Sequence, residues 1–292
     1  MFDFRYYVAS IAGLFLMLAV GILLGVGISG RGFVSDAERT RLNGIIADLQ
    51  QKADAAEELQ LQQRAARDFV ASAYPVLAND RLAGKRIGVV VLGPLQQDVF
   101  RFVESAIHDD AGGMVTRTRA LVLPLRLEAV EAALTSQPEL SGYVGDPELG
   151  SLGRDLGREL ASGGETPLWD TLEGEIVEER FGGFAQPLDG IVVIRSAEPQ
   201  AGASARFVAG LYDGLNSTGV PVVGIEPSAV DPSAIPVFQR HRLSTVDGID
   251  GDLGRLALIL VLAGADPGDY GVRETADDGL LPPIEPLPVP GG

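Results

Sequence analysis

The sequence predicts an α/β protein with an N-terminal transmembrane helix, a coiled-coil stalk and a mostly parallel α/β sandwich domain of the Rossmann or flavodoxin type. Three observations predict this organisation. Residues 6–30 carry no charge, and residues 35–74 place apolar side chains at spacings of three and four. Residues 82–265 then alternate buried-type apolar runs with helical patterns, as βαβ proteins do.

The apolar run 6–30 follows a short flank, residues 1–5. A helix of about 20 residues crosses a hydrocarbon core of roughly 30 Å, so this run is long enough to span a membrane. A cleaved signal peptide is one alternative, although the apolar part is long and the leader is weakly basic. A buried core helix is the other, and the length disfavours it. Gly21 and Gly25 form a GxxxG pair, which makes them candidates for a helix-helix contact.

Residues 35–74 are predicted to form one long helix that ends near Pro75. Its heptad seam is half polar or alanine, which is typical of a weak coiled coil and favours a homodimer. At 1.5 Å per residue, about 40 residues make a stalk of about 60 Å. A single amphipathic helix folded back on the domain remains an alternative. The seam candidates are Leu42, Ile45, Leu49 and Leu59.

The domain, residues 82–265, is predicted from apolar strand runs and helical periodicity. The expected strands are 86–92, 114–123, 190–194 and 220–225, with a short strand or loop at 244–249; the expected helices are 99–107, 127–134, 203–215 and 253–263. The stretch 136–187 has no clear pattern, and we interpret it as helices and loops. The tail, residues 266–292, is proline-rich and is expected to be disordered.

Composition narrows the function classes. The net charge of −17 argues against nucleic-acid binding, because a phosphate backbone would be repelled. The chain has no cysteine, two histidines and three methionines, so soft metal ligands are scarce. We therefore assign no metal ligand and no cofactor.

No catalytic motif is found. The first strand is not followed by GxGxxG, and the chain lacks a GxxxxGK[ST] phosphate cradle and a GxSxG elbow. We therefore predict no enzyme and assign no catalytic or cofactor-binding residue. The densest polar cluster differs from an EF-hand in its spacing, and we expect Asp250 or Asp252 to cap the helix that follows. This motif of unknown role contains Ser244, Thr245, Asp247, Asp250 and Asp252.

Several stretches resemble the family of the mycobacterial copper transport outer-membrane protein. They are FRYYVASIAGLFLMLAVGILLG, the strand GKRIGVVVL, the segment STVDGIDGDLGRLALILVL and the following DYGV. The resemblance implies an envelope protein, with its body outside the cytoplasm, that serves copper homeostasis and lets copper leave the cell. Arginines beyond the apolar run mildly favour the opposite orientation, but long domains translocate regardless of such charges. No family metal residue can be transferred to a position of this chain.

Three hypotheses follow. The leading one is a single-pass, membrane-anchored, dimeric envelope protein of the copper transport family, with other envelope proteins as further partners and no nucleic acid. A membrane-anchored envelope scaffold or interaction protein unrelated to copper is the main alternative. The third is an enzyme or small-molecule binder that uses the carboxyl edge of the sheet near Gly93 and Gly224.

Overall fold

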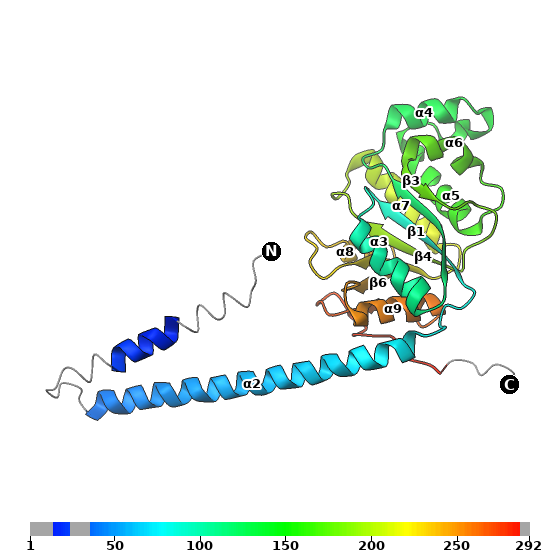
Figure 1. The fold of residues 1–292 in the computed structure, drawn as a ribbon. Helices are drawn as coiled ribbons and strands as arrows, with labels where there is room; N and C mark the ends of the chain where they lie inside the picture. Colours follow the sequence, from blue (N-terminus) through cyan, green and yellow to red (C-terminus); the bar gives the residue numbers. More distant parts are fainter. Residues whose placement is uncertain (1–13, 24–35, 287–292) are drawn as a thin grey trace. The chain divides into compact units, whose positions relative to one another are not determined.

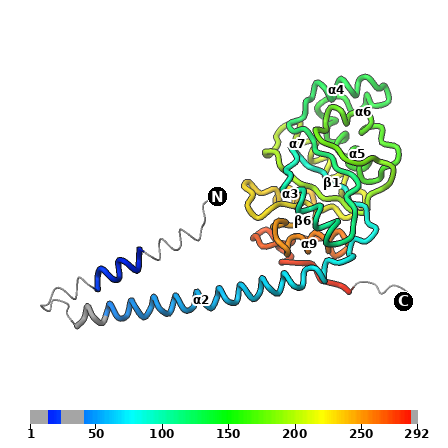
Figure 2. The backbone as a smooth tube through the Cα atoms, viewed as in Figure 1, coloured from blue at the N-terminus to red at the C-terminus, as the bar shows by residue number. Residues whose placement is uncertain are grey.

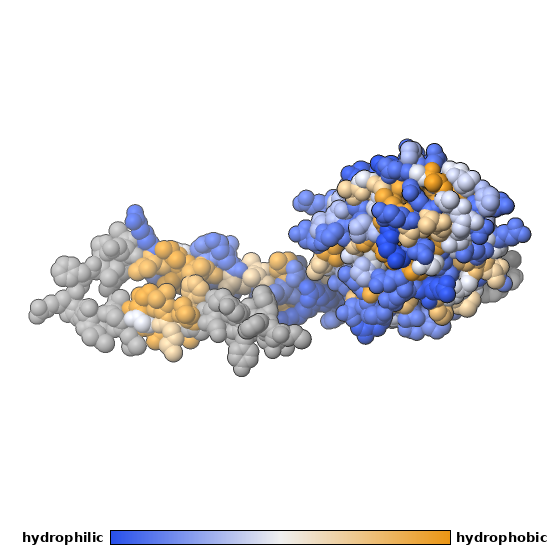
Figure 3. Space-filling model, turned by 90° about the horizontal axis from the view of Figure 1, so that it is seen from above, coloured by the Kyte–Doolittle hydropathy of each residue, from blue (hydrophilic) through white to orange (hydrophobic). Residues whose placement is uncertain are grey.

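The computed structural model describes residues 14–23 and 36–286, and the chain divides into two compact units, Met1–Ala66 and Arg67–Gly292 (Figure 1). Residues 14–23 are helical and belong to the run predicted to span a membrane; the rest of that run, including Gly25, lies outside the described residues. Their apolar side chains are exposed, and Figure 3 shows such side chains gathered on this unit. Within the described ranges, no helix has the length and apolar character that crossing a membrane requires.

The candidate contact residue Gly21 lies in the helical stretch 14–23, where a β-carbon would meet nothing within 4 Å. The long helix α2 (Asp36–Ala78) carries the candidate seam. The four seam residues are each about half exposed: Leu42, Ile45, Leu49 and Leu59. The coiled coil and the dimer stay predictions.

The sequence predicted that the long helix ends soon after Pro75, and helix α2 ends at Ala78 with the proline inside its last turn. Tertiary packing outweighs the proline here, because Tyr74 and Ala78 are buried in the core of the second unit. The Tyr74 hydroxyl also donates a hydrogen bond to Asp110, with an O–O distance of 2.5 Å. The last turn of α2 is thus part of the domain.

The domain contains a seven-stranded sheet in the order β3-β2-β1-β4-β5-β6-β7. Strand β3 pairs antiparallel at one edge, and all the other pairs are parallel. The mostly parallel α/β sheet predicted from the sequence is confirmed. The strands are β1 (Arg86–Leu92), β2 (Met114–Leu121), β3 (Val177–Phe181), β4 (Gly190–Arg195), β5 (Val222–Glu226), β6 (Ser244–Asp247) and β7 (Asp269–Tyr270).

Two hydrophobic cores lie on opposite faces of the sheet, because side chains alternate along each strand. In β1, Val90 and Leu92 join one core, whereas Val89 and Val91 join the other. The first core is covered by α4 (Leu127–Thr135), η2 (Pro138–Tyr143), α5 (Leu149–Ser162), α6 (Pro167–Ile176), α7 (Gly202–Asn216) and α8 (Ile235–Arg240), and η3 (Asp146–Glu148) lies between η2 and α5 in the chain. The second is covered by the end of α2, α3 (Gln97–Glu104), η1 (Ser105–Asp110) and α9 (Asp252–Ala263) (Figure 1).

Helices α5 and α7 approach each other through glycines. A β-carbon at Gly153 would overlap the carbonyl oxygen of Phe207, and one at Gly214 would overlap that of Arg154. Gly157 and Gly210 are packed against the facing backbone in the same way. Small residues at these positions let the two backbones come together, as GxxxG pairs do in membranes.

Two segments differ from the sequence-based expectation. The stretch 136–187 contains helices as expected but also β3, whose side chains are mostly exposed and so give no alternating pattern. The tail expected to be disordered from residue 266 contains β7, where Tyr270 is buried. Figure 2 shows this segment following α9 in the chain and running beside it. Pairing with β6 orders it, a long-range contact that local composition does not reveal.

Candidate functional site

The carboxyl ends of β1 and β4 form the point where doubly wound proteins bind ligands, because the chain leaves β1 in one direction and β4 in the other. Here hydrogen bonds join the two loops directly. The backbone N–H groups of Ser196 and Ala197 donate to the Leu92 carbonyl at 3.1 and 2.8 Å. The Ser196 hydroxyl donates to the Pro94 carbonyl at 2.6 Å, and a β-carbon at Gly93 would lie 2.6 Å from the Ala197 nitrogen. Gly93 is therefore needed for loop packing.

Gly224, the other glycine considered for a ligand site, lies within β5. A β-carbon there would overlap the Phe238 ring of α8. This glycine makes room for a helix on the sheet and does not border a ligand space.

The motif of unknown role gathers at the carboxyl ends of β5 and β6. Ser244, Thr245 and Asp247 are buried in β6. The Thr245 hydroxyl donates to Asp269 of β7 at 2.6 Å. The first half of the motif thus attaches the C-terminal edge strand to the sheet.

Asp247 fixes the segment that follows β7. The residue is 3% exposed, and its carboxylate accepts the backbone N–H groups of Val272 and Arg273 at 2.9 and 3.1 Å. Gly271 has a φ of +146°, and a β-carbon there would overlap the Asp247 carboxylate. The segment that contains Asp247 and the DYGV segment that contains Gly271, both quoted above for the family resemblance, therefore contact each other.

Glu226, at the end of β5, completes this contact. Its Oε1 lies 2.8 Å from Nη1 of Arg273, and its Oε2 accepts the Ala234 N–H at 2.7 Å. Arg273 also donates from Nη2 to the carbonyls of Ser228 and Val230, at 2.7 and 3.1 Å. We refer to Glu226, Asp247, Asp250, Gly271 and Arg273 together as the carboxyl-edge latch.

The prediction that Asp250 or Asp252 caps α9 is wrong. The residue before α9 is Gly251, and no side chain caps the helix. Asp250 instead accepts hydrogen bonds from the Ser228 backbone N–H at 2.7 Å and from its hydroxyl at 2.8 Å. Burial opposes ionisation of Asp250, but these bonds outweigh it and lower its pKa. Asp252 pairs with Arg255 within α9, so neither carboxylate is left for the N-terminus of the helix.

Two buried arginines form a second polar cluster, which the sequence analysis missed. Arg117 and Arg119, each 2% exposed, lie two residues apart on β2, and their guanidinium carbons lie 4.4 and 4.7 Å from the centre of the Phe184 ring. Arg117 donates to the carbonyls of Leu160, Gly183 and Gln186. Burial, together with the charge of Arg119, lowers the pKa of Arg117 to about 10.

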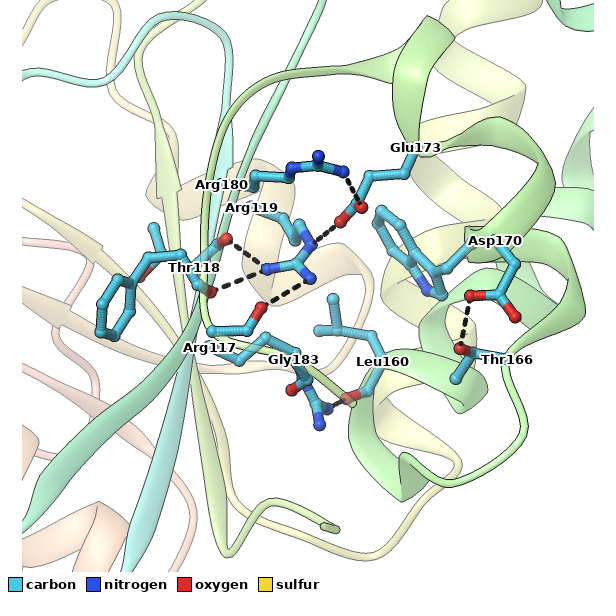
Figure 4. Close-up of polar contacts among 12 residues, drawn as sticks. Arg117, Thr118, Arg119, Leu160, Thr166, Asp170, Glu173, Arg180 and Gly183 are labelled. Atoms are coloured by element: carbon cyan, nitrogen blue, oxygen red, sulfur yellow. Dashed lines mark hydrogen bonds and ion pairs between the residues drawn. The ribbon is translucent and has the colours of Figure 1, made fainter. Parts of the chain in front are cut away.

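Arg119 is held differently, as Figure 4 shows. Its Nε lies 2.5 Å from Glu173 as an ion pair, although these two atoms do not meet hydrogen-bond geometry. Its other nitrogens donate to the carbonyls of Thr118, Phe181 and Gly182. Burial lowers the pKa of Arg119, and Glu173 opposes this change. The repeated Thr-Arg in β2 was the available signal, because residues two apart on a strand share a face.

The arginine cluster has a structural role. The guanidinium groups bind the carbonyls of the turn that follows β3, and Arg180 of β3 also pairs with Glu173. They connect the antiparallel edge strand to α5 and α6, and their donors are directed at protein acceptors.

The histidines lie apart from both clusters. His108 is in η1, with Nδ1 3.3 Å from the Gly113 carbonyl oxygen. His241 follows α8, with Nδ1 3.3 Å from Asp213 and its ring 5.1 Å from that of Tyr212. Over residues 14–23 and 36–286, no three side chains of His, Cys, Asp or Glu are grouped so as to hold a metal ion.

Comparisons with known proteins agree with the resemblance noted in the sequence. The family model described as "Copper transport outer membrane protein, MctB" matches residues 1–281. Curated relatives named "Copper transporter MctB", from Mycobacterium bovis and Mycobacterium tuberculosis, are 28% identical over 314 residues. These alignments cover 94% of this chain and 98% of the relatives.

Proposed function

The chain belongs to the MctB family of copper transport outer membrane proteins, and from this membership we propose that it is a single-pass envelope protein that serves copper homeostasis by supporting copper export. The observation that carries the proposal is the extent of the similarity. The family match begins at residue 1 and so includes the apolar run 6–30 as well as the domain. The relatives of comparable length carry the name of a copper transporter.

We propose that this role is structural or mediated by partners, and that the chain has no catalytic activity of its own. The chain contains no cysteine, and so offers copper no thiolate. The latch carboxylates Glu226 and Asp247 are occupied by backbone N–H groups and by Arg273. Both facts favour a protein that supports export through its contacts.

A deletion strain tests the copper role. Growth in rising copper and cellular copper content should both change on deletion and return with the wild-type chain, whereas zinc tolerance, the matched control, should not. Unchanged copper tolerance and content would refute the proposal. Envelope defects without a copper effect would instead support a scaffold unrelated to copper.

Topology is tested by fusing reporters after Gly292. We propose that the body lies outside the cytoplasm, so a reporter that works only outside should be active there. Activity confined to a reporter of the cytoplasmic type would reverse the orientation.

The absence of cysteine makes the proposed dimer simple to test. Leu49→Cys places a thiol on the seam, and Gln51→Cys places one two residues away on another face of α2. Oxidation in membranes should join Leu49→Cys chains and leave Gln51→Cys chains single. Gly21→Leu and Gly25→Leu should lower the yield of Leu49→Cys crosslinks. Equal crosslinking at both cysteine positions would refute the proposed seam. An unchanged yield of Leu49→Cys crosslinks in the glycine variants would refute the glycine contact.

A further inference from the structure

A cavity of about 310 Å³ lies at the carboxyl ends of β1 and β4, next to the point where the two loops are joined. It is lined by Leu92 at the end of β1, Ala197 after β4, Val208 of α7 and Val237 of α8. Its volume is at the lower end of the roughly 300–1,000 Å³ found for small-molecule sites, and such sites are mostly apolar. The cavity therefore suits a compact apolar group.

Tyr212 of α7 gives the cavity a polar group without a partner. Its side chain lines the cavity, and the residue is 1% exposed. The ring contacts Phe238 edge to face at 5.7 Å. No described residue forms a hydrogen bond with the hydroxyl, and burial raises the pKa of Tyr212, so the hydroxyl keeps its proton as a donor. The hydroxyl is therefore free to donate to a molecule held in the cavity.

The charged lining is mainly basic. Arg195 at the end of β4 and Arg240 at the end of α8 line the cavity together with one carboxylate, Glu198. His241 also lines it, with Nδ1 3.3 Å from Asp213. Arg195 donates from Nη2 to the Pro232 carbonyl at 2.7 Å, which fixes one end of its guanidinium. The remaining N–H groups of the two arginines are suited to an anionic group.

We propose that this cavity binds a small organic anion with a compact apolar body, such as an aromatic carboxylate. The apolar body packs on Leu92 and Val208, the anionic group binds Arg195 and Arg240, and the Tyr212 hydroxyl donates to one of its oxygens. The proposal does not depend on the copper role, since none of these residues belongs to the carboxyl-edge latch.

The test uses the full chain in detergent and the photoreactive anion 4-benzoylbenzoate as the probe, with neutral benzophenone as its matched counterpart. Irradiation should label peptides of α7 and α8, and half-saturation should need at least tenfold less of the anion than of the neutral probe. Tyr212→Phe removes only the hydroxyl and should weaken labelling about three- to tenfold. Arg195→Gln combined with Arg240→Gln should weaken it tenfold or more.

Two further variants complete the test. Ala209→Phe fills the cavity from α7 and should abolish labelling there, whereas Arg158→Gln, on the exposed face of α5, should not change it. The fluorescence of the single tryptophan, Trp169, shows that each variant is folded. Equal affinity for the two probes, or unchanged labelling of folded Ala209→Phe, would overturn the proposal.

Discussion

Replacing Asp247 with asparagine should release the C-terminal segment from the domain. The carboxylate accepts two backbone N–H groups, and hydrogen bonds to charged groups contribute about 1.5–3 kcal/mol each. Asparagine keeps one acceptor and turns an NH₂ group toward the other N–H. We expect a cost of about 3 kcal/mol, which raises the open population of the segment roughly 150-fold.

Trypsin measures this opening, because Arg273 is itself a cleavage site and its side chain is held by Glu226. When opening and closing are faster than cleavage, the cleavage rate follows the open population. Mass spectrometry of the fragment 274–292 should therefore show much faster release from Asp247→Asn than from the wild type. Unchanged Trp169 fluorescence would show that the opening is local.

Two variants control the experiment. Asp252→Asn makes the same change of charge, but Asp252 pairs with Arg255 within α9 and does not contact the segment. Gly271→Ala leaves the charge unchanged and should also speed cleavage, because its β-carbon would overlap the Asp247 carboxylate. Equal cleavage of the Asp247→Asn and Asp252→Asn proteins would refute the latch.

Three other predictions concern stability, measured by urea unfolding of the full chain. Gly153→Ala should destabilise the domain by about 2 kcal/mol or more because α5 and α7 must separate, whereas Gly150→Ala, whose β-carbon stays 3.8 Å from the nearest atom, should be neutral or stabilising by up to about 1 kcal/mol. Arg117→Lys should cost about 2–4 kcal/mol because an ammonium cannot reach three carbonyls in the geometry of a guanidinium, and exposed Arg126→Lys should change little. The folded pKa of Asp250 is below its ordinary value of 3.8, so its ionised carboxylate stabilises the folded state. The difference in unfolding free energy between the wild type and Asp250→Asn should be full above pH 3.8 and should disappear as the pH falls through the folded pKa.

The sequence predicted the parts of the fold that local patterns encode. The runs at β1, β4 and β5 are continuously apolar because both faces of the sheet are covered, and α7 and α9 follow helical periodicity. Strand β3 has no such pattern, since it lies at an exposed edge and is held by arginines of β2.

The site could be predicted only in part, for a related reason. The motif carboxylates were identified from their density, but Asp247 binds residues 25 and 26 positions further along the chain. Asp250 likewise binds Ser228, 22 positions earlier. Helix capping was the nearest local explanation, and tertiary contacts replaced it. The partners of these carboxylates become visible only once β5, β6 and β7 are placed side by side.

Copper itself can test whether the latch is structural. If Asp247 or Glu226 were a copper ligand, copper would compete for the carboxylate oxygens with the Val272 and Arg273 N–H groups or with the Arg273 guanidinium. This competition would favour the open segment. We therefore expect micromolar Cu²⁺ to leave the rate of cleavage after Arg273 unchanged. Trypsin activity on a short peptide in the same copper solution, and a parallel zinc series, control for effects on the protease. Faster release of 274–292 with copper alone would contradict a purely structural latch, because only a ligand that prefers the open state can increase its population.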